Sequence, residues 1–343
     1  MAKISIIIPC YNVSSYIDRC LTSVTMQTIG MDAMEIICID DASTDDTWQK
    51  LQQWEQQYPK QFITVHCDTN ARQGTARNIG LSYSSCEWIC FIDSDDWVEP
   101  DYLEKLYSIA QMTNCDIVTS PLVRDSSSTL SFFENRSTGK EHRYMVIDTS
   151  EKRKLFIILR SMEYSACGKL IRKSLLTDYQ IFFPENLTYE DTYWGSLIHL
   201  YTKTVYFLEY KLYHYFVNPH STVLQTNSEH HLDLLTIQLK LWNEWGRRGF
   251  LESFKEELEY DFLYSCYLRF LKIIVFRYQK PPFSLFLLLK NLISDRIPDY
   301  SQNYYIRQIE QPEFYQILFQ AITLPLNKES FREFTAYIKT IGM

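Results

Sequence analysis

Three carboxylates follow a strongly apolar run near residue 90. The run covers residues 88–92 and predicts a buried strand, and Asp93-Ser94-Asp95-Asp96 comes directly after it. In open α/β sheets, ligands bind at the carboxyl ends of strands. Carboxylate oxygens suit Mg²⁺ or Mn²⁺, and an ion held by only one or two carboxylates keeps positions for substrate phosphates. The segment therefore suggests a metal-diphosphate site, although it could also be a solvated turn before a helix that begins near Pro100.

Strand and helix signals alternate through the first third of the chain. Strands are predicted over residues 3–8 (ended by Pro9), 35–39, 62–66, 88–92 and 116–119. Helices are predicted between them from about residue 15, from residue 43 to about 58, over 74–83 and over 100–113. Ser15 with Asp18, and Ser43 with Asp46, have the spacing of capping boxes. Strands that alternate with helices imply βαβ units and a mostly parallel sheet.

The alternation ends after Pro121. Residues 125–139 are rich in Ser, Thr and Asn and predict a loop. Strands are expected over 143–147, 205–208 and 212–217, and helices over 151–159 and 190–201. From about Leu232 the pattern is helical to the end, with Leu235, Leu239 and Trp242 on one face. We therefore expect three parts, residues 1–120, 121–224 and 225–343.

Composition is that of an ordinary globular protein. Hydrophobic residues make up 46% of the 343 residues and charged residues 22%, with a formal net charge of -8. Nucleic-acid binding is disfavoured, because no run of Lys and Arg stands out. The nine cysteines lack a paired framework. The closest pair, Cys86 and Cys90, flanks or lies in a predicted buried strand, which indicates core thiols in a reducing compartment. No secretory signal and no run as long as a membrane span is visible, so we expect a cytoplasmic protein, with peripheral contact to the inner face of the membrane left open.

Several segments together resemble the family 2 glycosyltransferases, which have the GT-A fold. They are Ile7-Ile8-Pro9-Cys10-Tyr11-Asn12, Cys38-Ile39-Asp40-Asp41-Ala42-Ser43-Thr44-Asp45-Asp46-Thr47, Gly74-Thr75-Ala76-Arg77-Asn78-Ile79-Gly80-Leu81, Phe91-Ile92-Asp93-Ser94-Asp95-Asp96 and Glu190-Asp191. The resemblance covers about residues 3 to 222, and its specificity lies in the order and spacing of the motifs. It implies an α/β fold of the GT-A type: a Rossmann-like, mostly parallel sheet with helices on both faces, followed by a C-terminal helical region. Residues 1–120 would be the nucleotide-sugar-binding half and 121–224 the acceptor-binding half.

The resemblance assigns residues to the nucleotide base. Pro9, Tyr11 and Asn12 belong to the loop that packs on the base, and Asp41 looks like the carboxylate that accepts the ring N–H of uracil, with Asp40 beside it. A planar base needs an apolar or aromatic face and a hydrogen-bond acceptor, which these residue types supply. Tyr11 could instead fill the core, and either aspartate could cap the following helix.

The resemblance also assigns residues to the diphosphate and a metal ion. Arg77 occupies the place of a basic residue near the diphosphate. Asp93 and Asp95 match the D-x-D pair around Ser94, with Asp95 the expected direct metal ligand and Asp93 nearer the ribose. His220 would complete the metal site or contact a phosphate. The implied cofactor is Mn²⁺ or Mg²⁺, which would neutralise the leaving diphosphate as a Lewis acid. Arg77 could instead be a surface charge, and His220 an exposed loop residue.

Asp191 matches the family's catalytic base. An acceptor hydroxyl is a poor nucleophile unless a carboxylate takes its proton in the transition state. The resemblance implies an inverting hexosyl- or N-acetylhexosaminyltransferase that uses a nucleotide diphosphate sugar, with UDP the expected nucleotide. The acceptor would be a hydroxyl of a glycan or lipid-linked glycan in bacterial cell-surface polysaccharide synthesis. Glu190 and Asp191 could instead be first-turn residues favoured by the helix dipole.

Two other classes of protein remain as alternatives. A phosphatase of the haloacid dehalogenase type also uses D-x-D after a strand, but its nucleophile normally lies on the first strand, whereas here the pair follows the fourth predicted strand. A catalytically inactive sugar-nucleotide-binding module is opposed by the intact Asp93, Asp95 and Asp191. The region 225–343 carries no family signal, and acceptor recognition, homo-oligomer formation and membrane contact are all open to it.

Overall fold

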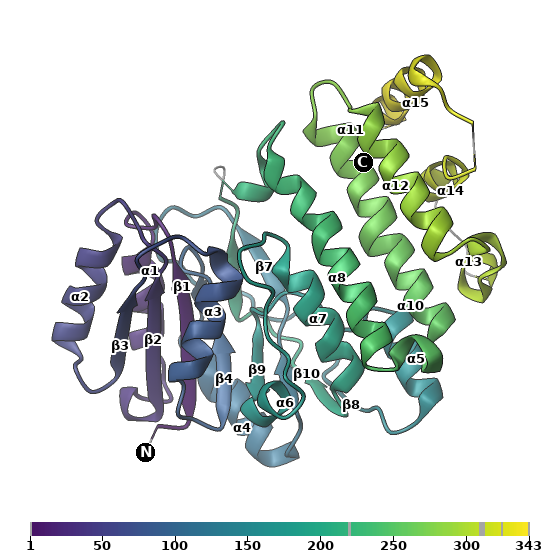
Figure 1. The fold of residues 1–343 in the computed structure, drawn as a ribbon. Coiled ribbons are helices and arrows are strands. Elements are labelled where there is room, and N and C mark those ends of the chain that lie inside the picture. The colour runs from purple at the N-terminus through teal and green to yellow at the C-terminus, as the bar shows by residue number, and fades with distance from the viewer. Residues whose placement is uncertain (1, 219–220, 309–312, 324, 342–343) are drawn as a thin grey trace. The chain divides into compact units, whose positions relative to one another are not determined.

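Four apolar runs of the N-terminal part form neighbouring parallel strands. These strands are β1 (Ile4–Cys10), β2 (Met34–Asp40), β3 (Phe62–His66) and β4 (Trp88–Phe91). They pair in the order β3-β2-β1-β4. Every residue of β1 and β4 is buried, as expected for central strands of a parallel sheet with both faces covered. The interleaved helices are α1 (Ile17–Thr25), α2 (Thr47–Gln57) and α3 (Arg72–Tyr83), which flank these strands in Figure 1.

The second half of the sheet is mixed. Its strands are β6 (Ile117–Thr119), β8 (Arg143–Val146), β9 (Lys169–Arg172) and β10 (Thr204–Phe207). β9 lies antiparallel between β4 and β6, β10 is parallel to β6, and β8 is the antiparallel edge strand. The eight-stranded order is β3-β2-β1-β4-β9-β6-β10-β8. The architecture is therefore the expected α/β one, with a large, mostly parallel sheet.

A small three-stranded sheet forms directly after the loop that follows β4. Its strands are β5 (Trp97–Val98), β11 (Tyr213–Phe216) and β7 (Leu122–Asp125), in the order β5-β11-β7. The other helices before residue 219 are α4 (Tyr102–Thr113), α5 (Ser150–Ile158), α6 (Lys173–Thr177) and α7 (Glu190–Tyr201), and the 3-10 turn η1 (Met31–Ala33) precedes β2. This small sheet brings residues 213–216, distant in the sequence, to the segment after Asp93-Ser94-Asp95-Asp96.

This computed structural model describes every residue except 1, 219–220, 309–312, 324 and 342–343. The chain divides into two compact units, residues 1–153 with 162–219, and residues 154–161 with 220–343. The predicted division into 1–120, 121–224 and 225–343 stays a prediction. Among the described residues, none of the helices combines the length and the apolarity that crossing a membrane requires.

The C-terminal unit is helical, as predicted. Its elements are η2 (Thr222–Leu224), η3 (Glu229–Leu232), α8 (Asp233–Arg247), α9 (Phe250–Ser253), α10 (Lys255–Phe262), η4 (Leu263–Leu268), α11 (Arg269–Arg277), α12 (Phe283–Arg296), η5 (Tyr300–Gln302), α13 (Tyr304–Gln308), α14 (Glu313–Gln320) and α15 (Lys328–Ile341). The buried stripe of α8 includes Leu235 but runs through Leu234, Leu241 and Trp245, while the predicted Leu239 and Trp242 are half-buried. The second half of α5 and the residues that follow it, up to Ser161, belong to this unit, in which Lys154 and Arg160 pair with carboxylates of α10.

Both predicted capping boxes are wrong. Within the described chain, neither α1 nor α2 has a side-chain hydrogen bond from its N-cap residue. Ser43 Oγ instead accepts the Asn12 N–H at 2.9 Å, and the N–H of Thr47, where α2 begins, donates to Asp45 Oδ1 at 3.0 Å. Local spacing therefore indicated where the two helices begin. It did not indicate which side chain bonds to which backbone group, because contacts between loops decide that.

Pro9 does not end β1, which continues to Cys10. The last pair between β1 and β4 is Ile7↔Phe91, so Pro9 lies where that ladder has already ended, while on the other side Pro9 pairs with Ile39 of β2. A proline fits a strand at a position like this one, where a neighbouring ladder does not need its missing N–H.

Candidate active site

The segments after β1, β2 and β4 lie at the same edge of the sheet, because the three strands are parallel neighbours. Asn12, at a φ of 51°, joins two of these segments. Its N–H donates to Ser43 Oγ, and its Oδ1 accepts the Thr44 N–H at 2.8 Å. Asn tolerates this left-handed conformation better than most residues. The predicted base-binding loop and the Asp41 segment are thus held together by Asn12 itself.

Tyr11 and Pro9 have different environments. Tyr11 is 48% exposed, so the alternative that it fills the core is wrong. Pro9 is buried within β1. Of this pair, only the Tyr11 ring is open to a planar ligand.

Asp41 follows β2, and its buried side chain contacts the residue just before α3. Its Oδ1 accepts the Ala71 N–H at 2.8 Å. Burial raises the pKa of Asp41, while the backbone N–H groups of Ala71 and Arg72 act in the opposite direction. The N-cap of α2 is Asp46, so the alternative that Asp40 or Asp41 caps that helix is wrong. A buried carboxylate at this position has the acceptor chemistry expected for uracil recognition.

Asp40 is fully buried beside Asp41. Its Oδ2 lies 2.6 Å from Nδ1 of His66, the last residue of β3. This pair joins the ends of β2 and β3. His66 was not predicted from the sequence, because a single His after a strand carries no chemical spacing.

Arg77 joins the end of β4 to the start of α7. Its Nη2 donates to Asp93 Oδ1 at 2.8 Å and its Nη1 to Glu190 Oε1 at 2.5 Å. Arg77 is only 3% exposed, so the alternative of a surface charge is wrong. Burial alone would lower the pKa of Arg77, but the charges of Asp93 and Glu190 raise it above its ordinary value. Gln73 Nε2 also donates to Asp93 Oδ1, at 3.0 Å.

The tetrad after β4 is not a solvated turn, because Ser94 and Asp96 are buried. Asp96 accepts hydrogen bonds from the Tyr213 hydroxyl at 2.8 Å and from the Phe216 N–H at 2.7 Å. Burial, with the charges of Asp93 and Asp95, raises the pKa of Asp96 well above its usual range. Asp96 therefore holds β11 to the loop after β4.

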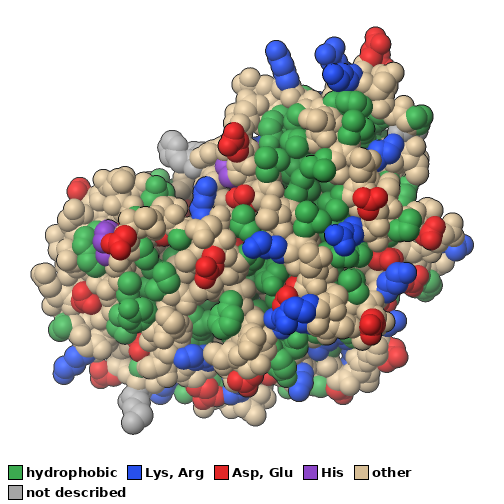
Figure 2. All heavy atoms as spheres, in the orientation of Figure 1, with side chains coloured by type: hydrophobic (Ala, Val, Ile, Leu, Met, Phe, Trp, Pro, Cys, Tyr) green, Lys and Arg blue, Asp and Glu red, His purple; other side chains and the backbone are tan. Residues whose placement is uncertain are grey.

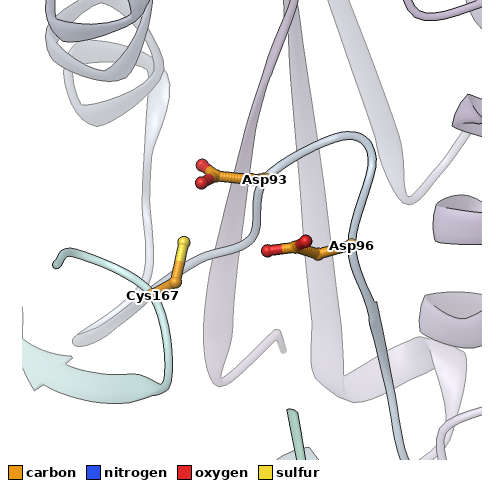
Figure 3. A group of neighbouring side chains, drawn as sticks. All are labelled: Asp93, Asp96 and Cys167. Atoms are coloured by element: carbon orange, nitrogen blue, oxygen red, sulfur yellow. The ribbon is translucent and has the colours of Figure 1, made fainter. Parts of the chain in front are cut away.

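Cys167 lies beside this loop, just before β9. In Figure 3, Asp93 and Asp96 extend from one loop toward the Cys167 thiol, and ligand atoms of the three lie within 4.8 Å of one another. Metal binding needs a thiolate, yet burial raises the pKa of Cys167 well above its ordinary value. Both Asp96 oxygens already accept hydrogen bonds. This trio therefore fits a Mg²⁺ or Mn²⁺ ion poorly. All nine cysteines are free, and Cys86 and Cys90 are buried, as expected.

Asp95 fits a divalent cation better. Its Oδ2 accepts from Asn218 Nδ2 at 3.0 Å. Burial raises the pKa of Asp95, and the neighbouring charge of Asp93 raises it further. A divalent ion would stabilise both carboxylates in their charged form. His220, the third predicted metal ligand, lies outside the described residues.

Glu190 and Asp191 open α7, as predicted. Both lie in the first turn of α7, where the helix dipole favours a carboxylate, and the buried Glu190 in addition pairs with Arg77. Burial raises the pKa of Glu190, while Arg77 lowers it. Asp191 is half-buried and accepts a hydrogen bond from Thr192 Oγ1 at 3.4 Å. The Asp93–Arg77–Glu190 connection thus ties the helix that carries Asp191 to the loop that carries Asp95.

The family model for glycosyl transferase family 2 matches residues 5–179, half of the chain. Glycosyltransferase GlyA of Streptococcus pneumoniae is 30% identical over 222 residues, 62% of this chain and 30% of GlyA. The putative glycosyltransferase EpsH of Bacillus subtilis is 30% identical over 228 residues, 64% of this chain and 62% of EpsH. A poly(ribitol-phosphate) beta-glucosyltransferase of Bacillus spizizenii is 28% identical, over 54% of this chain and 27% of its own length. The chain thus covers less than two thirds of each of these curated relatives.

Solved structures share the fold. Residues 1–349 of TarS from Staphylococcus aureus, in complex with UDP-GlcNAc, match with a TM-score of 0.65 and 20% identity, over 86% of this chain and 80% of that one. A second structure of residues 1–349 of TarS matches with a TM-score of 0.64 and 19% identity, over 93% of this chain and 86% of that one. Family membership excludes the phosphatase alternative. The chain belongs to glycosyl transferase family 2 and has the GT-A fold.

Proposed function

We propose that this enzyme transfers a sugar from UDP to a hydroxyl of a glycan acceptor, with inversion at the anomeric carbon, a divalent ion at Asp95 and Asp93, and Asp191 as the general base. One observation carries the proposal: Arg77 contacts both Asp93 and Glu190, so the D-x-D loop and the start of α7 form one charged site. The family match ends at residue 179, before α7, so the role of Asp191 rests on this geometry and on the resemblance.

The donor side of the proposal depends on Tyr11 and Asp41. The exposed Tyr11 ring offers a stacking face to a nucleotide base, and the buried Asp41 carboxylate offers an acceptor to the uracil ring N–H. The TarS structures were determined with UDP-GlcNAc and with UDP, which supports a uridine nucleotide by analogy of fold. We assign Asn12 to holding the Tyr11 loop against the segment after β2.

The chemical step is a single displacement. The acceptor oxygen forms a bond to the anomeric carbon while the bond from that carbon to the diphosphate oxygen breaks, and the hydroxyl proton passes to Asp191. When bound, Mn²⁺ or Mg²⁺ supplies Lewis-acid stabilisation of the leaving diphosphate. Asp95 and Asp93 would hold that ion, and Asp191 would approach the acceptor from the start of α7.

The acceptor we propose is a glycan or lipid-linked glycan of the bacterial cell surface. Relatives named as poly(ribitol-phosphate) glucosyl- and N-acetylglucosaminyltransferases support this class. We also propose a cytoplasmic location with peripheral contact to the inner face of the membrane. The C-terminal unit is our candidate for acceptor recognition, membrane contact or homo-oligomer formation.

Substitution of Asp191 tests the mechanism. Asn is nearly isosteric with Asp but cannot take the proton, so Asp191→Asn should lower transfer by about 10²–10⁴-fold while UDP binding stays near normal. The exposed Asp178 serves as a control, since Asp178→Asn should leave both unchanged. Turnover measured with a UDP-sugar panel and NMR of the product anomer decide the question. Retained configuration, or near-normal turnover of Asp191→Asn, would rule this mechanism out.

A further inference from the structure

We propose that Arg77 is a positioning residue that fixes Asp191 relative to the D-x-D loop, and that it does not contact the donor diphosphate. The inference deepens the proposed function and rests on it. It differs from the expectation drawn from the family resemblance, in which Arg77 lies near the diphosphate.

The guanidinium of Arg77 has no surface left for a ligand. Its Nη1 and Nη2 donate to Glu190 and Asp93, and among the described residues its Nε has no hydrogen-bond partner although it is buried. The ring of Phe183 lies 5.2 Å from the guanidinium carbon. Phe183 in turn stacks on Trp194, with ring centroids 4.8 Å apart and planes 7° apart. Arg77 is therefore enclosed by two carboxylates and an aromatic stack.

The segment that leads into α7 is fixed to α3 by further contacts. The Asn78 side chain donates to the Phe183 carbonyl at 2.8 Å and accepts the Phe183 N–H at 2.9 Å. A Cβ added at Gly74 would lie 2.7 Å from the Pro184 carbonyl oxygen and 3.0 Å from Glu190 Cγ. Consecutive turns of α3 thus fix both ends of the segment from Phe183 to Glu190, and Asp191 is the next residue.

Charge makes this arrangement dependent on Arg77. Without its cation, the half-buried carboxylate of Asp93 and the buried carboxylate of Glu190 would repel each other and lack compensation. They would then separate, which moves the start of α7 relative to the loop after β4. Transfer is sensitive to such changes, since a misplacement of about 1 Å can cost about 10²-fold in rate.

The test is a cycle of Arg77→Gln, Glu190→Gln and the double variant. Arg77→Gln should lower kcat by about 10–100-fold, the usual effect of removing a group that orients a reacting residue. The double variant should recover part of this loss, because it also removes the unpaired Glu190 charge. Arg77→Lys should fall between wild type and Arg77→Gln, because one ammonium keeps the charge but cannot bridge both carboxylates in the same way.

Nucleotide binding separates positioning from diphosphate contact. Affinities for UDP and UMP should change in parallel in Arg77→Gln, whereas loss of a diphosphate contact would weaken UDP selectively. Arg153→Gln is the matched control. Arg153 is buried in the same N-terminal unit as Arg77, but it donates to the carbonyls of His199 and Thr202. Arg153→Gln should lower the melting temperature without affecting kcat in the folded enzyme.

Two results would overturn the proposal. One is a selective loss of UDP affinity in Arg77→Gln. The other is a double variant whose loss of kcat equals the product of the losses in Arg77→Gln and Glu190→Gln. If the wild-type enzyme transferred no sugar from UDP, the proposed function would fail. The coupling between positions 77 and 190 would still appear in melting temperatures, and its absence there would overturn the ion-pair connection. If Arg77→Gln does not fold, Arg77→Lys and the double variant provide the same comparison.

Discussion

The carboxylates after β4 have similar chemistry but three different environments. Asp93 pairs with Arg77, Asp95 accepts from Asn218, and Asp96 is buried against β11. The sequence predicted a cluster of acids at a strand end, but it could not separate these environments. Each depends on a partner more than 15 positions away, as in the 123-residue separation of Asp95 and Asn218.

The effect of a divalent ion on UDP binding should depend on Asp95. UDP should raise the melting temperature much more with Mn²⁺ or Mg²⁺ than with chelator, because the ion links Asp95 to the diphosphate. Asp95→Asn should abolish this difference while keeping the contact with Asn218, since the Asn amide oxygen can still accept. Thermal shift with and without chelator measures both. Equal stabilisation by UDP in chelator and in Mn²⁺ would contradict the metal assignment.

The preference of the enzyme for uridine nucleotides should depend on Asp41. Asp41→Asn replaces one acceptor oxygen by a donor, so a charged hydrogen bond to the uracil ring N–H should be lost at a cost of about 1.5–3 kcal/mol. Competition binding with UDP, GDP and ADP measures this preference. We expect UDP to bind best to the wild type and to lose its advantage in Asp41→Asn. If GDP or ADP outcompetes UDP on the wild type, the donor assignment is wrong.

At the scale of elements, most of the described strands were predicted, and three were not. The strand over 62–66 is observed with the predicted ends, and α7 begins and ends where it was predicted. Even β6, with three residues, was predicted. The strands that were missed are β5, β7 and β9, which pair with segments distant in the sequence. The predicted loop over 125–139 begins on the last residue of β7. Local patterns gave no sign of these three pairings.

Surface charge bears on the sequence prediction that the protein does not bind nucleic acid, which stays a prediction. Among the described side chains on the face in Figure 2, blue basic and red acidic groups are interspersed and do not gather into a basic stripe. The formal net charge of -8 points the same way.

Close packing of α3 on β1 should show in a glycine substitution. A Cβ at Gly80 would lie 2.4 Å from Ile7 Cγ2, so Gly80→Ala should force α3 away from the central strand and cost about 1–3 kcal/mol of stability. Gly246→Ala in α8 is the matched control, since its Cβ would make only an ordinary contact with Leu251 at 3.6 Å. Denaturant unfolding of both variants measures the difference. A Gly80→Ala protein as stable as wild type would show that this contact can relax freely.

At the scale of the whole chain, the catalytic family covers only part of the molecule. The family match lies within residues 5–179, whereas the C-terminal unit holds residues 220–343 and reaches back to include 154–161. Lys154 of α5 pairs with Glu257 at 3.3 Å, and Arg160, just after α5, pairs with Asp261 at 2.7 Å. The sequence predicted a helical C-terminal region, but charged residues on α5 gave no sign that they belong to it.

Removal of the C-terminal unit should therefore affect acceptor use more than UDP binding. A chain that ends at Asn218 keeps Tyr11, Asp41, Asp93 and Asp95, so UDP binding should persist, while acceptor use or solubility should fall. Part of α5 would lose its buried carboxylate partners in that chain. Asp261→Asn in the full-length protein isolates this effect: it should lower the melting temperature by less than a fully buried pair would, because Arg160 is about a third exposed. Size-exclusion chromatography, UDP binding and transfer assays on both proteins measure the outcome. A truncated chain with unchanged oligomeric state and full transfer activity would show that the C-terminal unit has no part in acceptor binding or assembly.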